Sequence, residues 1–241
     1  MNKQKLVRFI NKYYLNGIAD SVVLISNSTK ELLSTRFVSS DKTLLGVIQM
    51  NKGNFEDANI GIYTTEQLLK LLSVLDEDIN ITITKSGDKA ISMKLSDSMS
   101  SVNYMLSDPS IIDEPPQLQT IPNFELSIDI TSTVISKFIS GKAALPDTTT
   151  FTVITGNGVT QLVIGYSTVN TNRVTIPVTT SEFYSLDRTS FNAEYFSNIL
   201  IANKECQSAT LQVSSEGLAK INFKIDEYTS TYWLVATSEV D

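Results

Sequence analysis

Apolar side chains recur at helical spacing in four stretches of the 241-residue chain. In each stretch they stand three or four positions apart, which would give a helix one apolar face. The spacing predicts helices over 3–15, 65–75, 131–142 and 192–204. Gly17 follows the first stretch and Thr64 precedes the second, and both residue types are common at helix ends.

Most of the remaining chain alternates apolar and polar residues. This alternation is typical of antiparallel strands with one buried and one solvated face. The clearest predicted strands are 79–83, 91–95, 124–130, 151–153, 162–166, 174–178, 211–213 and 221–225. Asn157-Gly158 is a strong hairpin signal between two of them. The pattern predicts an α+β protein that is rich in strands.

A proline-rich stretch interrupts this pattern near the middle of the chain. Residues 107–122 read SDPSIIDEPPQLQTIP, and the four prolines favour an extended backbone. We therefore expect a linker between two domains of similar size. A shift of about 130 residues aligns the halves, so that Ile81 meets Leu211 and Gly87 meets Gly217. Each half reads helix, strands, helix, three strands, which indicates an internal duplication.

Composition excludes several kinds of chemistry. The chain has no histidine and one cysteine, Cys206, so catalytic triads, histidine metal sites and internal disulfides are excluded. Carboxylates cluster at 76–78 and 113–114, but neither cluster belongs to a recognised catalytic or metal-binding motif. The phosphate-binding pattern GxxxxGK[ST] is absent. We expect a protein that is not an enzyme and that needs no cofactor or metal.

No apolar run reaches the roughly 18 residues that span a bilayer, and the N-terminus makes a poor signal peptide. The sequence therefore favours a cytoplasmic protein with no membrane partner.

Positive charge is concentrated on the predicted helices although the net charge is −7. Lys5, Arg8 and Lys12 stand three and four positions apart, so they share one helical face. One interpretation is an ordinary solvated face. The other is that all the helices present cations to phosphate. The candidates for this role are Lys3, Lys5, Arg8, Lys12, Lys70, Lys137, Lys142 and Lys204.

The stretch NFEDANIGIYTTEQLLKLLSVLDEDINITI, continued by MKLSDSMSSVNYMLSDPSIIDEPP, resembles the DNA sliding clamps, most closely those of T-even-type bacteriophages. The helix AEYFSNIL and the closing strand TYWLVA are similar to the C-terminal domain of that family. The resemblance covers essentially the whole chain.

The resemblance implies an architecture and a function. It implies two clamp domains, 1–106 and 124–241, joined by a connector over 107–123, with sheets outside and four helices lining the inside. Three chains would close a homotrimeric ring through edge strands near 100–106 and 174–178. The ring would encircle double-stranded DNA without sequence preference, tether a DNA polymerase and be opened by an ATP-dependent clamp loader. A phage clamp would work in the cytoplasm of the host cell.

In that family a partner peptide docks in an apolar pocket beside the connector. The residues expected to form it here are Leu44, Leu45, Ile111, Ile112, Leu118 and Val235. An alternative is that these side chains only pin the linker to the domains. The rival function is a non-enzymatic, β-rich viral structural or assembly protein, which would explain the strands but not the recurring cationic helices.

Overall fold

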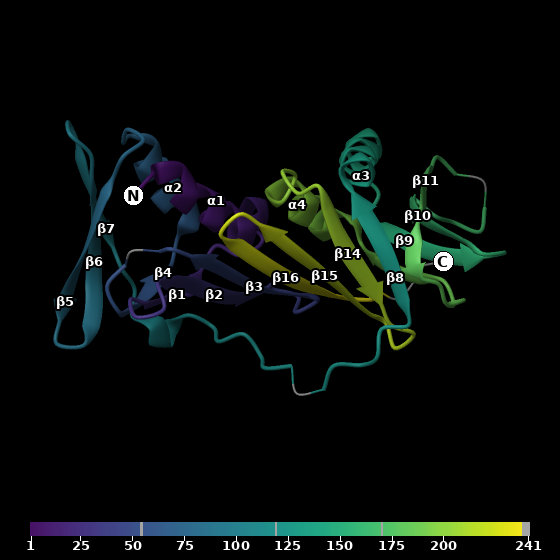
Figure 1. Cartoon of the computed structure of the whole chain (residues 1–241), viewed down its shortest axis with the longest axis horizontal. Helices are drawn as coiled ribbons and strands as arrows, with labels where there is room; N and C mark the ends of the chain where they lie inside the picture. The colour runs from purple at the N-terminus through teal and green to yellow at the C-terminus, as the bar shows by residue number, and fades with distance from the viewer. Residues whose placement is uncertain (54, 119, 170, 238–241) are drawn as a thin grey trace. The chain divides into compact units, whose positions relative to one another are not determined.

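The computed structural model describes residues 1–53, 55–118, 120–169 and 171–237 (Figure 1). The chain divides into two compact units. Unit 1 comprises 1–40, 46–116 and 226–230, and unit 2 comprises 41–45, 117–225 and 231–241. Residues 41–45 therefore belong to unit 2 although the chain on both sides of them belongs to unit 1. Residues 226–230 belong to unit 1 although the chain on both sides of them belongs to unit 2.

Unit 1 holds two helices, seven strands and two short 3₁₀ turns among its described residues. They are α1 (Lys3–Tyr14), η1 (Leu15–Gly17), β1 (Val22–Asn27), β2 (Leu32–Val38), β3 (Leu44–Asn51, whose first two residues group with unit 2), β4 (Ala58–Ile62), α2 (Thr65–Ser73), β5 (Asn80–Ser86), β6 (Lys89–Ser96), β7 (Ser101–Met105) and η2 (Pro109–Ile111). The strands hydrogen-bond in the orders β3-β2-β1-β4 and β5-β6-β7.

Unit 2 holds the remaining elements. They are β8 (Leu126–Thr131), α3 (Ser132–Ala144), β9 (Thr150–Gly156), β10 (Val159–Ile164), β11 (Val174–Val178), β12 (Thr180–Glu182), β13 (Thr189–Asn192), α4 (Ala193–Ala202), β14 (Ser208–Val213), β15 (Leu218–Ile225) and β16 (Tyr228–Val235, whose first three residues group with unit 1). Their orders are β11-β10-β9-β13 and β12-β8-β14-β15-β16.

The predicted internal repeat is confirmed by the strand order. The order β3-β2-β1-β4 has its counterpart in β11-β10-β9-β13, and β5-β6-β7 has its counterpart in β14-β15-β16. Along the chain, α1 precedes β1 and α2 precedes β5, as α3 precedes β9 and α4 precedes β14. Strand β8 corresponds in place to the isolated bridge between Asn2 and Asp78, and β12 has no counterpart among the described strands of unit 1.

The four predicted helices form, with small changes at their ends. Asn2 caps α1 by accepting a hydrogen bond from the Gln4 backbone at 2.9 Å. The helix ends at Tyr14 because Leu15 turns into the left-handed region, with φ of 46°. Helix α4 ends at Ala202, so Lys204 follows the helix instead of lying on it.

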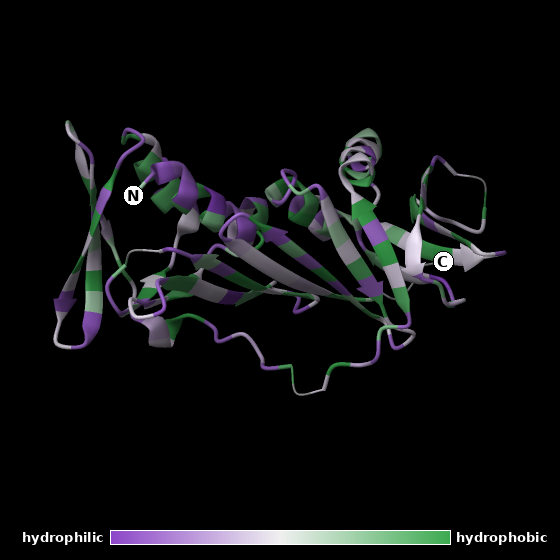
Figure 2. Ribbon diagram, in the orientation of Figure 1, coloured by the Kyte–Doolittle hydropathy of each residue, from purple (hydrophilic) through white to green (hydrophobic). Residues whose placement is uncertain are grey.

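Each unit buries the apolar stripes of its two helices. In unit 1 the stripes of α1 and α2 contribute Phe9, Tyr13 and Leu68 to the core. In Figure 2 the ribbons of both helices alternate between green, hydrophobic and purple, hydrophilic positions.

The core of unit 2 is built around aromatic rings. Phe151 on β9 stacks on Phe196 of α4, with ring centroids 4.7 Å apart, and meets Phe138 of α3 edge-on at 5.2 Å. All three side chains are fully buried. This cluster joins both helices of the unit to the sheet beneath them.

Candidate nucleic-acid interface

Helix α1 carries four of the eight predicted DNA-facing cations, and the turn between β15 and β16 packs against it within unit 1. Lys5 Nζ lies 3.2 Å from Glu227 Oε1, and Arg8 Nη2 lies 3.1 Å from Asp226 Oδ2. The Arg8 guanidinium also stacks over the Tyr228 ring at 4.9 Å. Each of these two cations thus already contacts a carboxylate.

Two of the eight cations lie in the interior instead of on the surface. Lys12 is fully buried, with its ammonium 5.4 Å from the centre of the Tyr228 ring. Lys142 is 7% exposed, donates a hydrogen bond to the Pro146 carbonyl at 2.9 Å and pairs with Glu194 at 3.1 Å. Neither ammonium can reach a phosphate in this conformation.

The other four candidates differ in their partners. Lys3 donates a hydrogen bond to the Leu75 carbonyl. Exposed Lys70 pairs with Glu66 one turn away on α2 at 2.6 Å, and this hydrogen bond raises the pKa of Lys70. Lys137 on α3 and Lys204 after α4 are exposed and form no ion pair with any described residue.

The connector begins on the opposite side of the unit 1 sheet from α1. Its start is tied to β4, because Ser107 N–H donates to the Gly61 carbonyl at 3.0 Å. Asp108 accepts from Lys89 at 2.6 Å and from the Ser110 backbone at 3.0 Å, which together lower the pKa of Asp108 to about 2. Arg36 on β2 donates to the Pro116 carbonyl at 2.6 Å. The segment 107–116 is therefore held at both of its ends.

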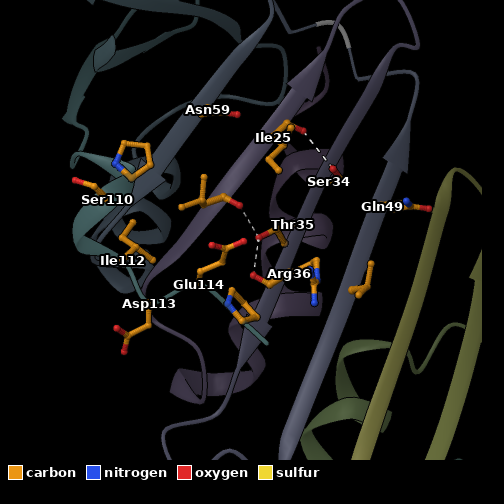
Figure 3. Close-up of a pocket in the computed structure, with 14 residues that line it drawn as sticks. Ile25, Ser34, Thr35, Arg36, Gln49, Asn59, Ser110, Ile112, Asp113 and Glu114 are labelled. Atoms are coloured by element: carbon orange, nitrogen blue, oxygen red, sulfur yellow. Dashed lines mark hydrogen bonds between the residues drawn. The ribbon is translucent and has the colours of Figure 1, made fainter. Parts of the chain in front are cut away.

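A pocket of about 540 Å³ lies between this segment and the face of the unit 1 sheet that carries Val23 and Ile25 (Figure 3). Apolar atoms come from Val23, Ile25 and Val47 on the strands and from Ile112 on the connector. Asp113 and Glu114 extend along the connector side. The pocket combines an apolar floor with a charged rim, to which Arg36 also contributes.

Of the six residues predicted to form a partner pocket, only Ile112 lines this one. Leu44 is fully buried and Leu45 is 7% exposed, so neither side chain is available to a partner, although Leu45 lies on the same face of β3 as Val47. Ile111, Leu118 and Val235 are exposed. The sheet residues that line the pocket were missed, although the alternation along 22–51 places Val23, Ile25 and Val47 on one face.

Two sheets end in strands whose outer edges are unpaired within the described part of the chain. Strand β7 is last in the three-stranded sheet of unit 1, and β11 is last in the four-stranded sheet of unit 2. The Leu106 N–H, just after β7, donates to the carbonyl of Ile91 on the neighbouring strand β6. Since donors alternate along a strand, the N–H groups of Asn103 and Met105 point away from the sheet. These strands match the edges expected from the sequence.

Two further features concern residues 1–53, 55–118, 120–169 and 171–237. No cluster of three or more histidine, cysteine, aspartate or glutamate side chains could hold a metal ion there. No helix in these ranges is long and apolar enough to cross a bilayer.

The fold of the chain is that of the proliferating cell nuclear antigens, a class of two-domain clamp. One such structure, from Entamoeba histolytica, matches with a TM-score of 0.74 and 14% identity over 98% of this chain and 96% of that one. PCNA from A. fulgidus, solved with the C-terminal region of FEN-1 bound, matches with a TM-score of 0.77 and 12% identity, over 100% and 98% of the two chains. No protein-family model and no curated protein sequence matches the chain.

Proposed function

We propose that this protein is a DNA sliding clamp, a non-enzymatic ring that encircles double-stranded DNA and tethers a DNA polymerase. The observation that carries the proposal is the duplicated clamp fold, which extends over essentially the whole chain in both solved structures. The sequence resemblance adds a narrower proposal, a clamp of T-even phage type that acts in the host cytoplasm and is opened by an ATP-dependent loader.

The arrangement of unit 1 supports a division of labour between its two sides. Helices α1 and α2 carry the cations that would face the duplex, and the connector lies on the opposite side of the sheet (Figure 1). Contacts of lysine and arginine with phosphate carry no sequence information, as sliding requires. The buried positions of Lys12 and Lys142 reduce the proposed contacts to Lys3, Lys5, Arg8, Lys70, Lys137 and Lys204.

The pocket beneath the connector is the proposed docking site for a partner peptide on unit 1. An apolar side chain would fill the space above Val23, Ile25 and Val47, as a peptide anchor does in a surface groove. In the A. fulgidus structure the bound segment is the C-terminal region of FEN-1. For the present chain we propose a short segment of the polymerase.

Ring closure is the property to test first. Three chains of 26.6 kDa give a trimer of roughly 80 kDa, in which β7 of one chain would pair with β11 of the next. Light scattering over a dilution series should reveal this mass at high concentration. A monomer at every concentration would contradict the ring.

An edge-strand variant tests how the ring closes. Asn103→Pro removes an outward N–H from β7, and a proline is tolerated where the N–H does not serve its own sheet. Asn103→Ala is the matched control, because it removes the same side chain and keeps the N–H. We expect the proline variant to form a weaker trimer than the alanine variant. Equal dissociation midpoints would contradict pairing through β7.

A further inference from the structure

The turn between β15 and β16 occupies the cationic face of α1 in unit 1. Its two residues, Asp226 and Glu227, contact Arg8 and Lys5 at 3.1 and 3.2 Å. The two carboxylates follow the two cations by more than two hundred positions in the sequence. Nevertheless, successive carboxylates meet cations that stand one helical turn apart. This registration places a paired negative charge where a duplex would place its phosphates.

The turn is fixed in this position by contacts other than the ion pairs. The Tyr228 hydroxyl donates to the Lys5 carbonyl at 3.0 Å, and the Asn51 N–H donates to the Glu227 carbonyl at 2.9 Å. Tyr228 is buried beneath Arg8 and Lys12. Because backbone and ring contacts position the turn, its carboxylates stay beside α1 without depending on the ion pairs.

Carboxylate and phosphate oxygens compete for the same donors. A guanidinium or ammonium that binds phosphate must leave or share its carboxylate partner, and a nearby carboxylate also repels the phosphate. The side chain of Asp226 is 62% exposed, so it lies at the surface that a duplex would approach. Lys5 and Arg8 are themselves partly exposed, which makes the exchange between the two partners geometrically feasible.

We propose that Asp226 and Glu227 are built-in competitors of DNA phosphate, which weaken the grip of α1 and keep the clamp mobile on the duplex. This inference rests on the proposed sliding-clamp function and adds determinants of affinity that lie outside the helices. A ring retained by its topology needs little intrinsic affinity, and cations that stay bound to particular phosphates would slow its movement. Lys137 and Lys204, which no described carboxylate pairs, would make the more persistent contacts.

The test removes the two charges while keeping the shape of both side chains. Asp226→Asn with Glu227→Gln changes the net charge from −7 to −5. The matched control, Asp88→Asn with Glu216→Gln, makes the same change on two other exposed turns, where neither residue forms an ion pair with any described residue. Binding of a labelled 30-base-pair duplex is followed by fluorescence anisotropy from 0.05 to 0.3 M KCl. Light scattering and circular dichroism verify that assembly and fold are unchanged.

We expect the Asp226/Glu227 variant to bind roughly tenfold more tightly at 0.1 M salt than the control variant. Each cation freed for phosphate adds about 0.9 to the slope of log affinity against log salt, so the slope should steepen by about one to two. Adding Lys5→Met and Arg8→Met should abolish the gain, because the competitors then have nothing to compete for.

The possible results distinguish the competitor role of the two acids from the proposed sliding-clamp function. If the wild type binds and the affinity for the duplex rises equally in the Asp226/Glu227 variant and in the Asp88/Glu216 control, the effect is one of net charge alone. The competitor role is then wrong. A gain that persists without Lys5 and Arg8 also overturns it. If no variant binds the duplex at any salt concentration, the competitor role fails, whereas the proposed function is tested separately by retention on circular DNA.

Discussion

Gly61 is the position where the connector most closely approaches the sheet, and Gly61→Ala tests this attachment. A Cβ built at residue 61 would lie 2.2 Å from the Ser107 carbonyl oxygen. Real Cβ atoms essentially never approach closer than 3.0 Å, so β4 and the connector must separate by about 0.8 Å. The atom it meets is backbone, which cannot move aside by changing a rotamer.

The cost of this substitution has two parts. Overpacking of a tight contact costs about 1–3 kcal/mol. Loss of the Ser107 N–H bond to the Gly61 carbonyl, which is 3.0 Å long, adds about 1 kcal/mol. We therefore expect Gly61→Ala to lower the free energy of unfolding by about 2–4 kcal/mol and to speed hydrogen exchange at Ser107.

Urea unfolding of the full chain, with hydrogen exchange read by mass spectrometry, measures both effects. Gly156→Ala is the matched control, because a Cβ there meets nothing within 4 Å and its φ is not positive. A Gly61→Ala protein as stable as this control, with Ser107 equally protected, would refute the reasoning about how the connector is attached.

Three further predictions follow from the same contacts. Phe151→Ala should lower the free energy of unfolding by about 3–5 kcal/mol, because removal of the fully buried ring leaves a cavity between α3 and α4. Phe151→Leu should lower it much less in urea unfolding, and equal losses would contradict the aromatic core. The lowered pKa of Asp108 means that its contribution to stability is present above about pH 4 and is lost as the pH falls through about 2; Lys89→Ala should raise that pKa in an NMR titration, and an unchanged value would contradict the ion pair. Lys137→Ala should weaken duplex binding, because each phosphate contact carries part of the salt-dependent affinity. Lys142→Met should leave the affinity within about twofold, because Lys142 is buried. Equal effects in the same anisotropy assay would contradict the division of the lysines into exposed contacts and buried residues.

Much of the fold is predictable from the sequence because its signals are local. Helical spacing marks α1 to α4 within two residues at each end, and the shift of about 130 residues anticipates the matching strand orders. The ends differ for local reasons as well. Leu15 adopts a left-handed conformation that no periodicity reveals, and it ends α1 one residue early.

The candidate interface is less predictable because its geometry depends on contacts between distant residues. Lys12 belongs to the same stripe as Lys5 and Arg8, yet Tyr228 covers it and removes it from the surface. The carboxylates that meet Lys5 and Arg8 come from a turn more than two hundred residues away. Spacing along α1 indicates which cations share a face, and it does not indicate which acids will lie beside them.

The partner pocket shows the same limit. The prolines predict a connector, but the pocket depends on the strand face that this segment covers. Leu44 lies on the buried face of β3, and Leu45 shares the face of Val47 but is buried outside the pocket, while Val23, Ile25 and Val47 line it. Alternation separates the two faces of a strand and cannot state which of them the connector crosses.

Retention on circular DNA tests the central claim most directly. The protein would be diluted until the trimer dissociates, mixed with a nicked circular plasmid and concentrated so that trimers form around the DNA without a loader. It would then be cross-linked between chains with glutaraldehyde and passed through gel filtration in about 0.5 M salt, where phosphate contacts are strongly weakened. We expect the cross-linked protein to elute with the circle and to be lost once a restriction enzyme cuts the DNA. Equal retention on circular and linear DNA, or none on either, would contradict a ring that encircles the duplex.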